Sequence, residues 1–387
     1  MSSPRTALPA ARNVTAESAL DVWSGFATTS SARRELANYG INRFDIPPTL
    51  PPLPLADEPH IAAWAESMVR AEQVGTWNAL TGILLQLRFP VAAGVSARAD
   101  YAAVLRRGIL SQLPPAGHGA SAVDEDGISL SLHVTDAGRI PVITCRSRPD
   151  FQTLVQACTR RNEPAELPES MGACVVAGYN NWTRIETAWR SAQQMGTFGD
   201  RSAFLSHLMP FKERYQDKFI ILSAGPYSSI RASTIGLDNA DWLRRSLILR
   251  RTHEATHYFT KRVFGSMQNT LFDELLADYA GMIDAFGSFR ATTFMRFMGI
   301  DGSGRYIGGR LANYRGTPAL SDEAFTGLAC AVVSAAKSLE RFDAHRRLSR
   351  PHTPISQILS ELARDGLEAL LVREKRWRSG ETRSRPT

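Results

Sequence analysis

Cysteine is scarce in this chain: Cys145, Cys158, Cys174 and Cys330 are the only four among 387 residues, and no two form a CxxC pair. A disulfide framework needs more cysteines at closer spacing, so we expect reduced thiols in or near the core. Nothing in their local sequence indicates an activated thiolate, which argues against a cysteine nucleophile.

Long apolar stretches are also missing. No segment approaches the ~20 apolar residues that cross a bilayer, and residues 1–15 lack the apolar core of a signal peptide. Hydrophobic residues still make up 43% of the chain and aromatic residues 9%, which is enough to bury a large core. We therefore expect a globular, cytoplasmic protein without a membrane partner.

The formal net charge of +7 at first suggests an anionic partner. More than half of this excess lies in residues 373–387, which hold six basic and two acidic side chains. A charged terminal segment of this kind is typically a solvated tail. We therefore expect no nucleic-acid partner, and weak binding of another anionic partner stays as the alternative.

A histidine pair carries the clearest chemical signal. His253 and His257 are four residues apart, so on a helix their imidazoles share one face, about 6 Å apart along the axis. This separation lets consecutive turns hold one zinc ion. Glu254 follows the first histidine and can take a proton from a metal-bound water, which makes it the candidate general base.

A catalytic zinc site usually has a third protein ligand and an open fourth position. The third histidine of the metzincin pattern is absent, because Thr260 and Val263 occupy the corresponding positions. Glu274 lies seventeen residues after His257 and fits a His₂Glu set, in which the glutamate comes from a second helix.

The sequence between these ligands favours two helices joined by a short turn. Gly265 is suited to end the first helix, and Thr270 and Asp273 match a capping box that begins the second. Glu274 is then left to face the metal. Asp278, one turn later on the same side, is expected to accept the outer N–H of a ligating histidine.

Over residues 240–290 this pattern resembles the gluzincin metallopeptidases, whose signature is HExxH followed by a downstream helix that carries ExxxD or ExxxE. The resemblance implies that His253, His257 and Glu274 bind Zn²⁺, that Glu254 acts as the base, and that Asp278 supports the ligands. It also implies a zincin-like fold.

Two alternatives to a zinc site stay open for this motif. Glu254 and His257 also form an ExxH element of the kind found in di-iron carboxylate bundles, although no other glutamate here has a histidine three positions later. Alternatively, both histidines are held by ordinary hydrogen bonds inside a buried helix.

A hydrolase of this type also needs a donor for the developing oxyanion. The candidates downstream of the motif are Tyr306, Arg310, Tyr314 and His345. The glycine-rich run at 299–309 fits neither GxGxxG nor a P-loop and is expected to be a mobile active-site loop. The histidines expected to be structural or at the surface are His60, His118, His133, His207 and His352.

Composition and periodicity divide the chain into segments. We expect a Pro-rich extension at 1–56, a helical segment at 57–126, a mixed β/α segment with an edge strand at 127–235, a helical metal-site domain at 236–372, and a basic tail at 373–387. The expected fold class is α+β and zincin-like, with a mixed sheet, an active-site helix and a helical C-terminal half.

Alternation of apolar and polar residues predicts a β-hairpin over 128–144. Further strands are expected at 173–177 and 218–223, and helices at 97–113, 240–264 and 322–341. The strand at 218–223 is either an edge strand that pairs with a substrate, with residues 223–228 as its rim, or a buried central strand.

These observations lead us to expect a zinc-dependent hydrolase that cleaves a peptide or amide bond with a metal-activated water. The alternatives are a biosynthetic metalloenzyme that uses the same site on a small molecule, and a non-catalytic metal-binding protein. Residues 85–90 and 171–185 also look like segments of uncharacterised bacterial proteins that carry a similar HExxH helix.

Overall fold

The computed structural model describes residues 16–115, 117–266 and 270–379. The chain divides into two compact units, which we call the sheet unit (Pro51–Phe259) and the helical unit (Met1–Leu50 with Thr260–Thr387). The division falls inside one long helix, α9 (Asn239–Val263). It does not follow the segments expected from composition, because the N-terminal residues belong with the C-terminal helices.

The sheet unit is built on a mixed four-stranded sheet in the order β1-β2-β4-β3. Its strands are β1 (Ile128–Thr135), β2 (Gly138–Cys145), β3 (Ala173–Asn180) and β4 (Gln216–Ser223). β1 and β2 form the expected antiparallel hairpin, β2 and β4 are parallel, and β3 and β4 are antiparallel. The α+β class and the hairpin are therefore confirmed.

β4 is an interior strand of this sheet. Four consecutive side chains, Phe219 to Leu222, are fully buried, as expected for a strand that is covered on both faces. Of the two alternatives for the strand at 218–223, the buried central strand is correct. The edges of the sheet are β1 and β3 instead.

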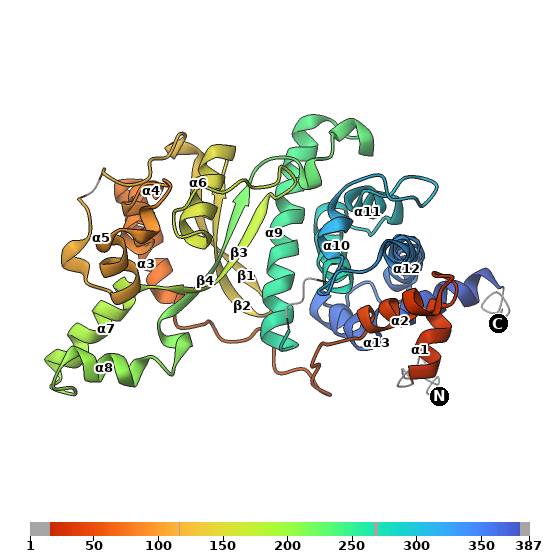
Figure 1. Ribbon diagram of the computed structural model, residues 1–387, viewed down its shortest axis with the longest axis horizontal. Coiled ribbons are helices and arrows are strands. Elements are labelled where there is room, and N and C mark those ends of the chain that lie inside the picture. Colours follow the sequence, from red (N-terminus) through yellow and green to blue (C-terminus); the bar gives the residue numbers. More distant parts are fainter. Residues whose placement is uncertain (1–15, 116, 267–269, 380–387) are drawn as a thin grey trace. The chain divides into compact units, whose positions relative to one another are not determined.

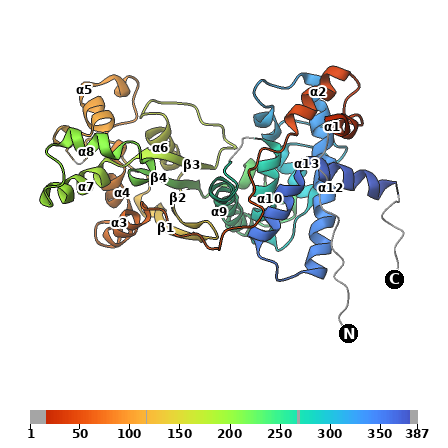
Figure 2. The same ribbon diagram turned by 90° about the horizontal axis from the view of Figure 1, so that it is seen from below.

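Helices cover both faces of the sheet. The helices on one face are α3 (Ile61–Val74), α4 (Thr76–Ile83) and α6 (Arg148–Thr159). In this layer Phe219 and Ile221 share a core cluster with Trp64 of α3 and Leu154 of α6. Side chains alternate along a strand, so Ile220 points to the opposite face, along which α9 runs (Figures 1 and 2).

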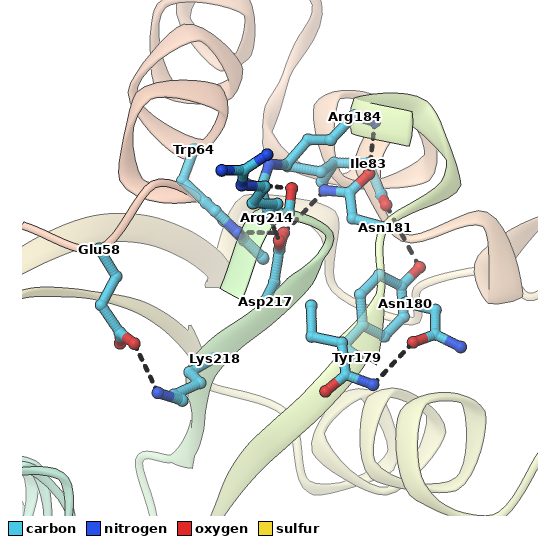
Figure 3. A network of polar contacts seen from close by, with 11 residues as sticks. Glu58, Trp64, Ile83, Tyr179, Asn180, Asn181, Arg184, Arg214, Asp217 and Lys218 are labelled. Carbon is cyan, nitrogen blue, oxygen red and sulfur yellow. Dashed lines mark hydrogen bonds and ion pairs between the residues drawn. The ribbon is translucent and has the colours of Figure 1, made fainter. Parts of the chain in front are cut away.

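A buried carboxylate joins these helices to the sheet. Asp217 of β4 is fully buried and accepts hydrogen bonds from the indole of Trp64 (2.9 Å) and the side-chain amide of Asn181 (2.7 Å). It also pairs with Arg184 (Figure 3). Asn181 caps α7 (Trp182–Gln194) by accepting the N–H of Arg184. Since a buried charge is tolerated when it is paired and hydrogen-bonded, this network fixes α3 and α7 on β4.

The helix expected at 97–113 forms only in part. Its pieces are α5 (Ala99–Tyr101), a π-helical turn (Ala102–Arg106) and a 3-10 turn (Leu110–Gln112). Gly108 explains the break, because its φ is +67° and a Cβ there would lie 2.2 Å from the ring of Trp182. Another short helix, α8 (Arg201–Leu208), follows α7.

The helical unit contains no β-strand within its described residues, apart from one isolated bridge between Ile300 and Tyr306. Its helices besides the end of α9 are α1 (Ala16–Trp23), α2 (Ser30–Tyr39), α10 (Leu271–Phe286), α11 (Ala291–Met298), α12 (Asp322–Ser349) and α13 (Ile355–Arg378). α12 packs against α2, α11 and α13 and forms the centre of this unit.

Two helices lie in the segment that composition marked as a Pro-rich extension. α1 and α2 bury Trp23 and Leu36 completely, and Thr29 caps α2 by accepting the N–H of Ala32. The carboxylate of Glu323 on α12 accepts both the amide and the hydroxyl of Thr28. These contacts make the N-terminal helices part of the core of the helical unit.

α10 begins and faces the core largely as expected. Thr270 occupies the N-cap position with extended backbone angles, but its side chain makes no capping hydrogen bond. Asp273 is buried and accepts a hydrogen bond from Thr260 at 3.4 Å. The expected capping box is therefore wrong, because its acidic member packs inward toward the end of α9.

In the part of the chain that the structure describes, no helix combines the length and apolarity needed to cross a membrane. Of the basic segment at 373–387, residues 373–378 form the last turns of α13, and residues 380–387 lie outside the described part. Arg378 in these turns pairs with the buried carboxylate of Glu374.

Candidate metal centre

α9 brings the two motif histidines together. The helix contains neither glycine nor proline over its 25 residues, so His253 and His257 lie on consecutive turns of an uninterrupted ladder. Both are buried, and their Nε2 atoms are 3.1 Å apart. The two rings therefore direct the same ring nitrogen toward one point.

This separation suits two ligands of one metal ion. Two nitrogens bound to a tetrahedral zinc ion at about 2.0–2.1 Å are about 3.3 Å apart. The observed 3.1 Å is close to that value, so little movement of either imidazole is required. The arrangement passes this test of fit without any change in the helix.

Tyr227 holds the far side of the first histidine. Its hydroxyl oxygen is 3.0 Å from Nδ1 of His253, and the two rings meet edge to face. Tyr227 was not among the residues predicted from the sequence, because it lies 26 positions upstream in a loop without any metal-site pattern. Outer partners of this kind orient a ligating histidine and set its tautomer.

The loop that carries Tyr227 is fixed to α9 at several points. The backbone N–H of Tyr227 donates to the hydroxyl of Ser246 at 3.0 Å. The buried guanidinium of Arg250 donates to the carbonyl oxygens of Ser223 (2.5 Å), Gly225 (3.0 Å) and Pro226 (3.1 Å). The loop and the histidines are thus held by one helix.

The two residues that directly follow Tyr227 have strained backbone angles. Ser228 and Ser229 adopt φ values of +51° and +57°, which residues with a Cβ rarely take. Such conformations cost on the order of 1 kcal/mol or more each and persist where the surroundings determine them. The residues directly before them are held by the hydrogen bonds of Arg250 and Ser246.

Glu274 lies on the buried face of α10 within a set of polar partners. The Arg310 guanidinium is 3.9 Å from its Oε2 and pairs directly with Asp278, one turn along the helix. Tyr314 also hydrogen-bonds to Glu274. Burial raises the pKa of Tyr314, so its hydroxyl stays protonated and remains a donor at neutral pH.

The three expected ligands form one group. His253, His257 and Glu274 each offer one ligand atom, and these atoms all lie within 4.8 Å of one another. In the described residues this is the one group of three or more His, Cys, Asp or Glu side chains with that property. All three are buried, which is unusual for a carboxylate and favours a shared cation.

Glu254, the expected base, is half-buried and does not belong to this group. It lies close to Cys174 on the edge strand β3: burial, followed by the nearby Glu254 carboxylate, raises the pKa of that thiol to about 12. All four cysteines are free, and burial also raises the pKa of Cys145 to about 12 and that of Cys158. These three thiols stay protonated at neutral pH.

Two of the four candidate oxyanion donors lie beside Glu274, and the other two have different surroundings. Arg310 and Tyr314 lie in one short 3-10 helix (Arg310–Tyr314) beside Glu274. Tyr306 instead exchanges hydrogen bonds with the backbone of Gly309 and packs on Phe325. His345 is exposed near the end of α12.

Asp278 pairs with Arg310, and at His253 the outer nitrogen meets Tyr227. The expected hydrogen bond from a ligating histidine to Asp278 stays a prediction. The fully buried Asp278 therefore supports the site through the arginine beside Glu274. A sequence pattern cannot reveal the pairing of Asp278 with Arg310, because Arg310 is 32 residues away in a short 3-10 helix.

The chain matches a known protein family. No curated protein and no solved structure matches the chain. One family model, described as a family of unknown function (DUF7005), matches residues 21–374 and so includes the residues of the candidate metal centre. The chain therefore belongs to the DUF7005 family.

Proposed function

We propose that this protein is a zinc-dependent hydrolase with a zincin-like active site. The observation that carries the proposal is the approach of the His253 and His257 Nε2 atoms to 3.1 Å, with a Glu274 oxygen in the same group. Two imidazoles and one carboxylate are the His₂Glu donor set of catalytic zinc sites.

The surroundings of the ligands suit this role. α9 directs Nε2 of both His253 and His257 toward one point. Arg310 and the Tyr314 hydroxyl both favour the ionised form of Glu274. When bound, zinc would act as a Lewis acid and lower the pKa of a coordinated water.

Glu254 is the proposed general base. It follows His253 on α9 and is half-buried, so its carboxylate is accessible to a substrate and to water. In this role it takes a proton from the attacking water and returns it to the leaving amine.

A peptide or amide is the proposed substrate. β3 is an edge strand, and its Cys174 lies close enough to Glu254 for the carboxylate to affect the thiol. An extended peptide that pairs with such an edge is held by main-chain hydrogen bonds, which places a peptide bond near the base.

A biosynthetic role on a small molecule is the second candidate. It is favoured by one observation, the burial of all three proposed ligands, since an open protease groove leaves its metal more accessible. In this case the same residues act on an amide or carbonyl of a compact substrate.

The decisive experiment combines metal analysis with one substitution. We expect the purified protein to contain close to one zinc ion per chain, and His257→Ala to lose it. Glu254→Gln should keep the zinc and lose hydrolysis of peptide or amide substrates. A wild-type protein that binds no zinc, or a Glu254→Gln variant with full activity, would overturn the proposal.

A further inference from the structure

We infer that Tyr227 is a positioning residue of the metal centre, whose hydroxyl accepts the Nδ1 proton of His253 and so keeps Nε2 available as a ligand. The inference rests on the proposed metal centre and adds to it a residue outside the HExxH and ExxxD pattern. It starts from the 3.0 Å separation between the Tyr227 oxygen and Nδ1.

The direction of this hydrogen bond follows from proton counting. A neutral imidazole carries one proton, so a histidine that binds metal through Nε2 must carry it on Nδ1. His253 is buried, and an N–H without an acceptor there would cost about 1–3 kcal/mol. Tyr227 provides that acceptor. The opposite direction would place the proton on Nε2 and exclude a metal.

Several hydrogen bonds hold Tyr227 and its loop in place. Ser246 accepts its backbone N–H, and Arg250 binds three carbonyl oxygens of the preceding loop. Ser246, Arg250, His253 and His257 are spaced by four, three and four residues, which places them along one face of α9. The two histidine ligands and the residues that hold Tyr227 therefore share one helix.

A neutral acceptor at this position also has a chemical consequence. Ligating histidines often donate to a carboxylate, which increases their basicity. A phenol oxygen accepts the same proton without adding a charge, so the centre keeps a smaller negative charge around the metal. Tyr227 thus fixes orientation and tautomer while leaving the ligand a neutral imidazole.

The test measures zinc affinity by competition with a chelator. Tyr227→Phe should bind zinc about 10–100-fold more weakly than the wild type, since loss of an outer partner typically has this effect. Tyr179→Phe is the matched control: this tyrosine has the same 5% exposure in the same unit, and its hydroxyl bonds to Leu85 and Ile83. Its zinc affinity should not change.

A second readout separates positioning from a structural effect. In zinc-loaded wild-type protein, ¹⁵N NMR should show the His253 proton on Nδ1 and protected from exchange, and in Tyr227→Phe that proton should exchange faster. If Tyr227→Phe folds poorly, Ser246→Ala loosens the same loop and should weaken zinc binding in the same direction.

The possible outcomes can be told apart. A wild-type protein without zinc affinity overturns the proposed metal centre itself. Normal zinc binding with equal affinity in Tyr227→Phe, or a wild-type His253 that carries its proton on Nε2, overturns the role of Tyr227 and leaves the metal centre standing.

Discussion

Nη2 of Arg310 lies 3.9 Å from Oε2 of Glu274, while the same guanidinium pairs with Asp278. The side chains of both carboxylates are at most 9% exposed, so one cation serves two buried anions on adjacent turns of α10. Without it, two carboxylates would repel each other in a site of low dielectric constant. Arg310 therefore links the stability of the helical unit to the ionisation of a proposed ligand.

Substitution Arg310→Gln should destabilise the protein by about 3–5 kcal/mol, because it breaks the buried ion pair with Asp278 from one side. Urea unfolding monitored by circular dichroism measures this loss. Arg305→Gln is the matched control, since Arg305 lies in the preceding segment and its side chain is 78% exposed in its pair with Asp301. The control should change stability by less than about 0.5 kcal/mol. Equal effects in the two variants would contradict the importance of the buried pair.

Arg250 should be the most sensitive arginine of α9. Arg250→Met removes the donor of three carbonyl oxygens, and the one at Ser223 is buried, where an unsatisfied group costs about 1–3 kcal/mol. We expect a loss of about 1–3 kcal/mol in unfolding free energy on this basis, together with weaker zinc binding.

The control for this substitution is Arg244→Met on the same helix. Arg244 is 62% exposed and pairs only with the nearby Asp241 among its described partners. Its loss should leave zinc affinity unchanged, as measured by chelator competition. A normal zinc affinity in Arg250→Met would show that the loop holds Tyr227 without the arginine.

The sequence pattern predicted the parts of the site that lie within short stretches of chain. The four-residue spacing of His253 and His257 requires only a continuous helix, and α9 provides it. Alternation over 128–144 likewise predicted a hairpin, because both strands and their turn are local. Glu274 was expected from the His₂Glu pattern on a second helix, and α10 supplies that helix, with a Glu274 oxygen in one group with the two histidines.

Features that depend on contacts between distant segments were not predicted. Tyr227 contacts His253 from a loop that Arg250 holds in place. No periodic pattern in the sequence predicts this contact. The interior place of β4 depends on which strands pair, which hydrophobicity alone did not decide. The expected capping box at residues 270–273 is wrong, because Asp273 accepts a hydrogen bond from Thr260, a residue that lies outside that four-residue pattern.

Glu323 should make the stability of the helical unit depend on pH in the acid range. Hydrogen bonds from Thr28 and Thr29 lower the pKa of this carboxyl from its usual 4.5 to about 2. A group whose pKa is lower in the folded state stabilises above its unfolded pKa, and this contribution fades as the pH falls toward the folded pKa. It is therefore complete above pH 4.5 and lost by about pH 2.

The comparison of wild type with Glu323→Gln tests this prediction. The wild type should be more stable from pH 5 to pH 7, and the two proteins should converge as the pH approaches 2. Thermal melting at a series of pH values measures the difference. A gap between the two proteins that stays constant over the whole range would contradict the assigned hydrogen bonds to ionised Glu323.

The Asp217 network should be the most sensitive polar position of the sheet unit (Figure 3). Asp217→Asn keeps the shape but removes the charge that balances Arg184, and it turns an amide N–H₂ toward the donors of Trp64 or Asn181. Breaking a buried pair from one side costs about 3–5 kcal/mol, which urea unfolding would detect directly. Asp57→Asn is the control, since Asp57 pairs with Arg139 at the surface and this substitution should change stability by less than about 1 kcal/mol.

In the double variant Asp217→Asn with Arg184→Met, the loss should be smaller than the sum of the two single losses, because each single change leaves the other partner unsatisfied. Strict additivity would mean that the two side chains act independently, and that Asp217 is held by the indole and the amide alone.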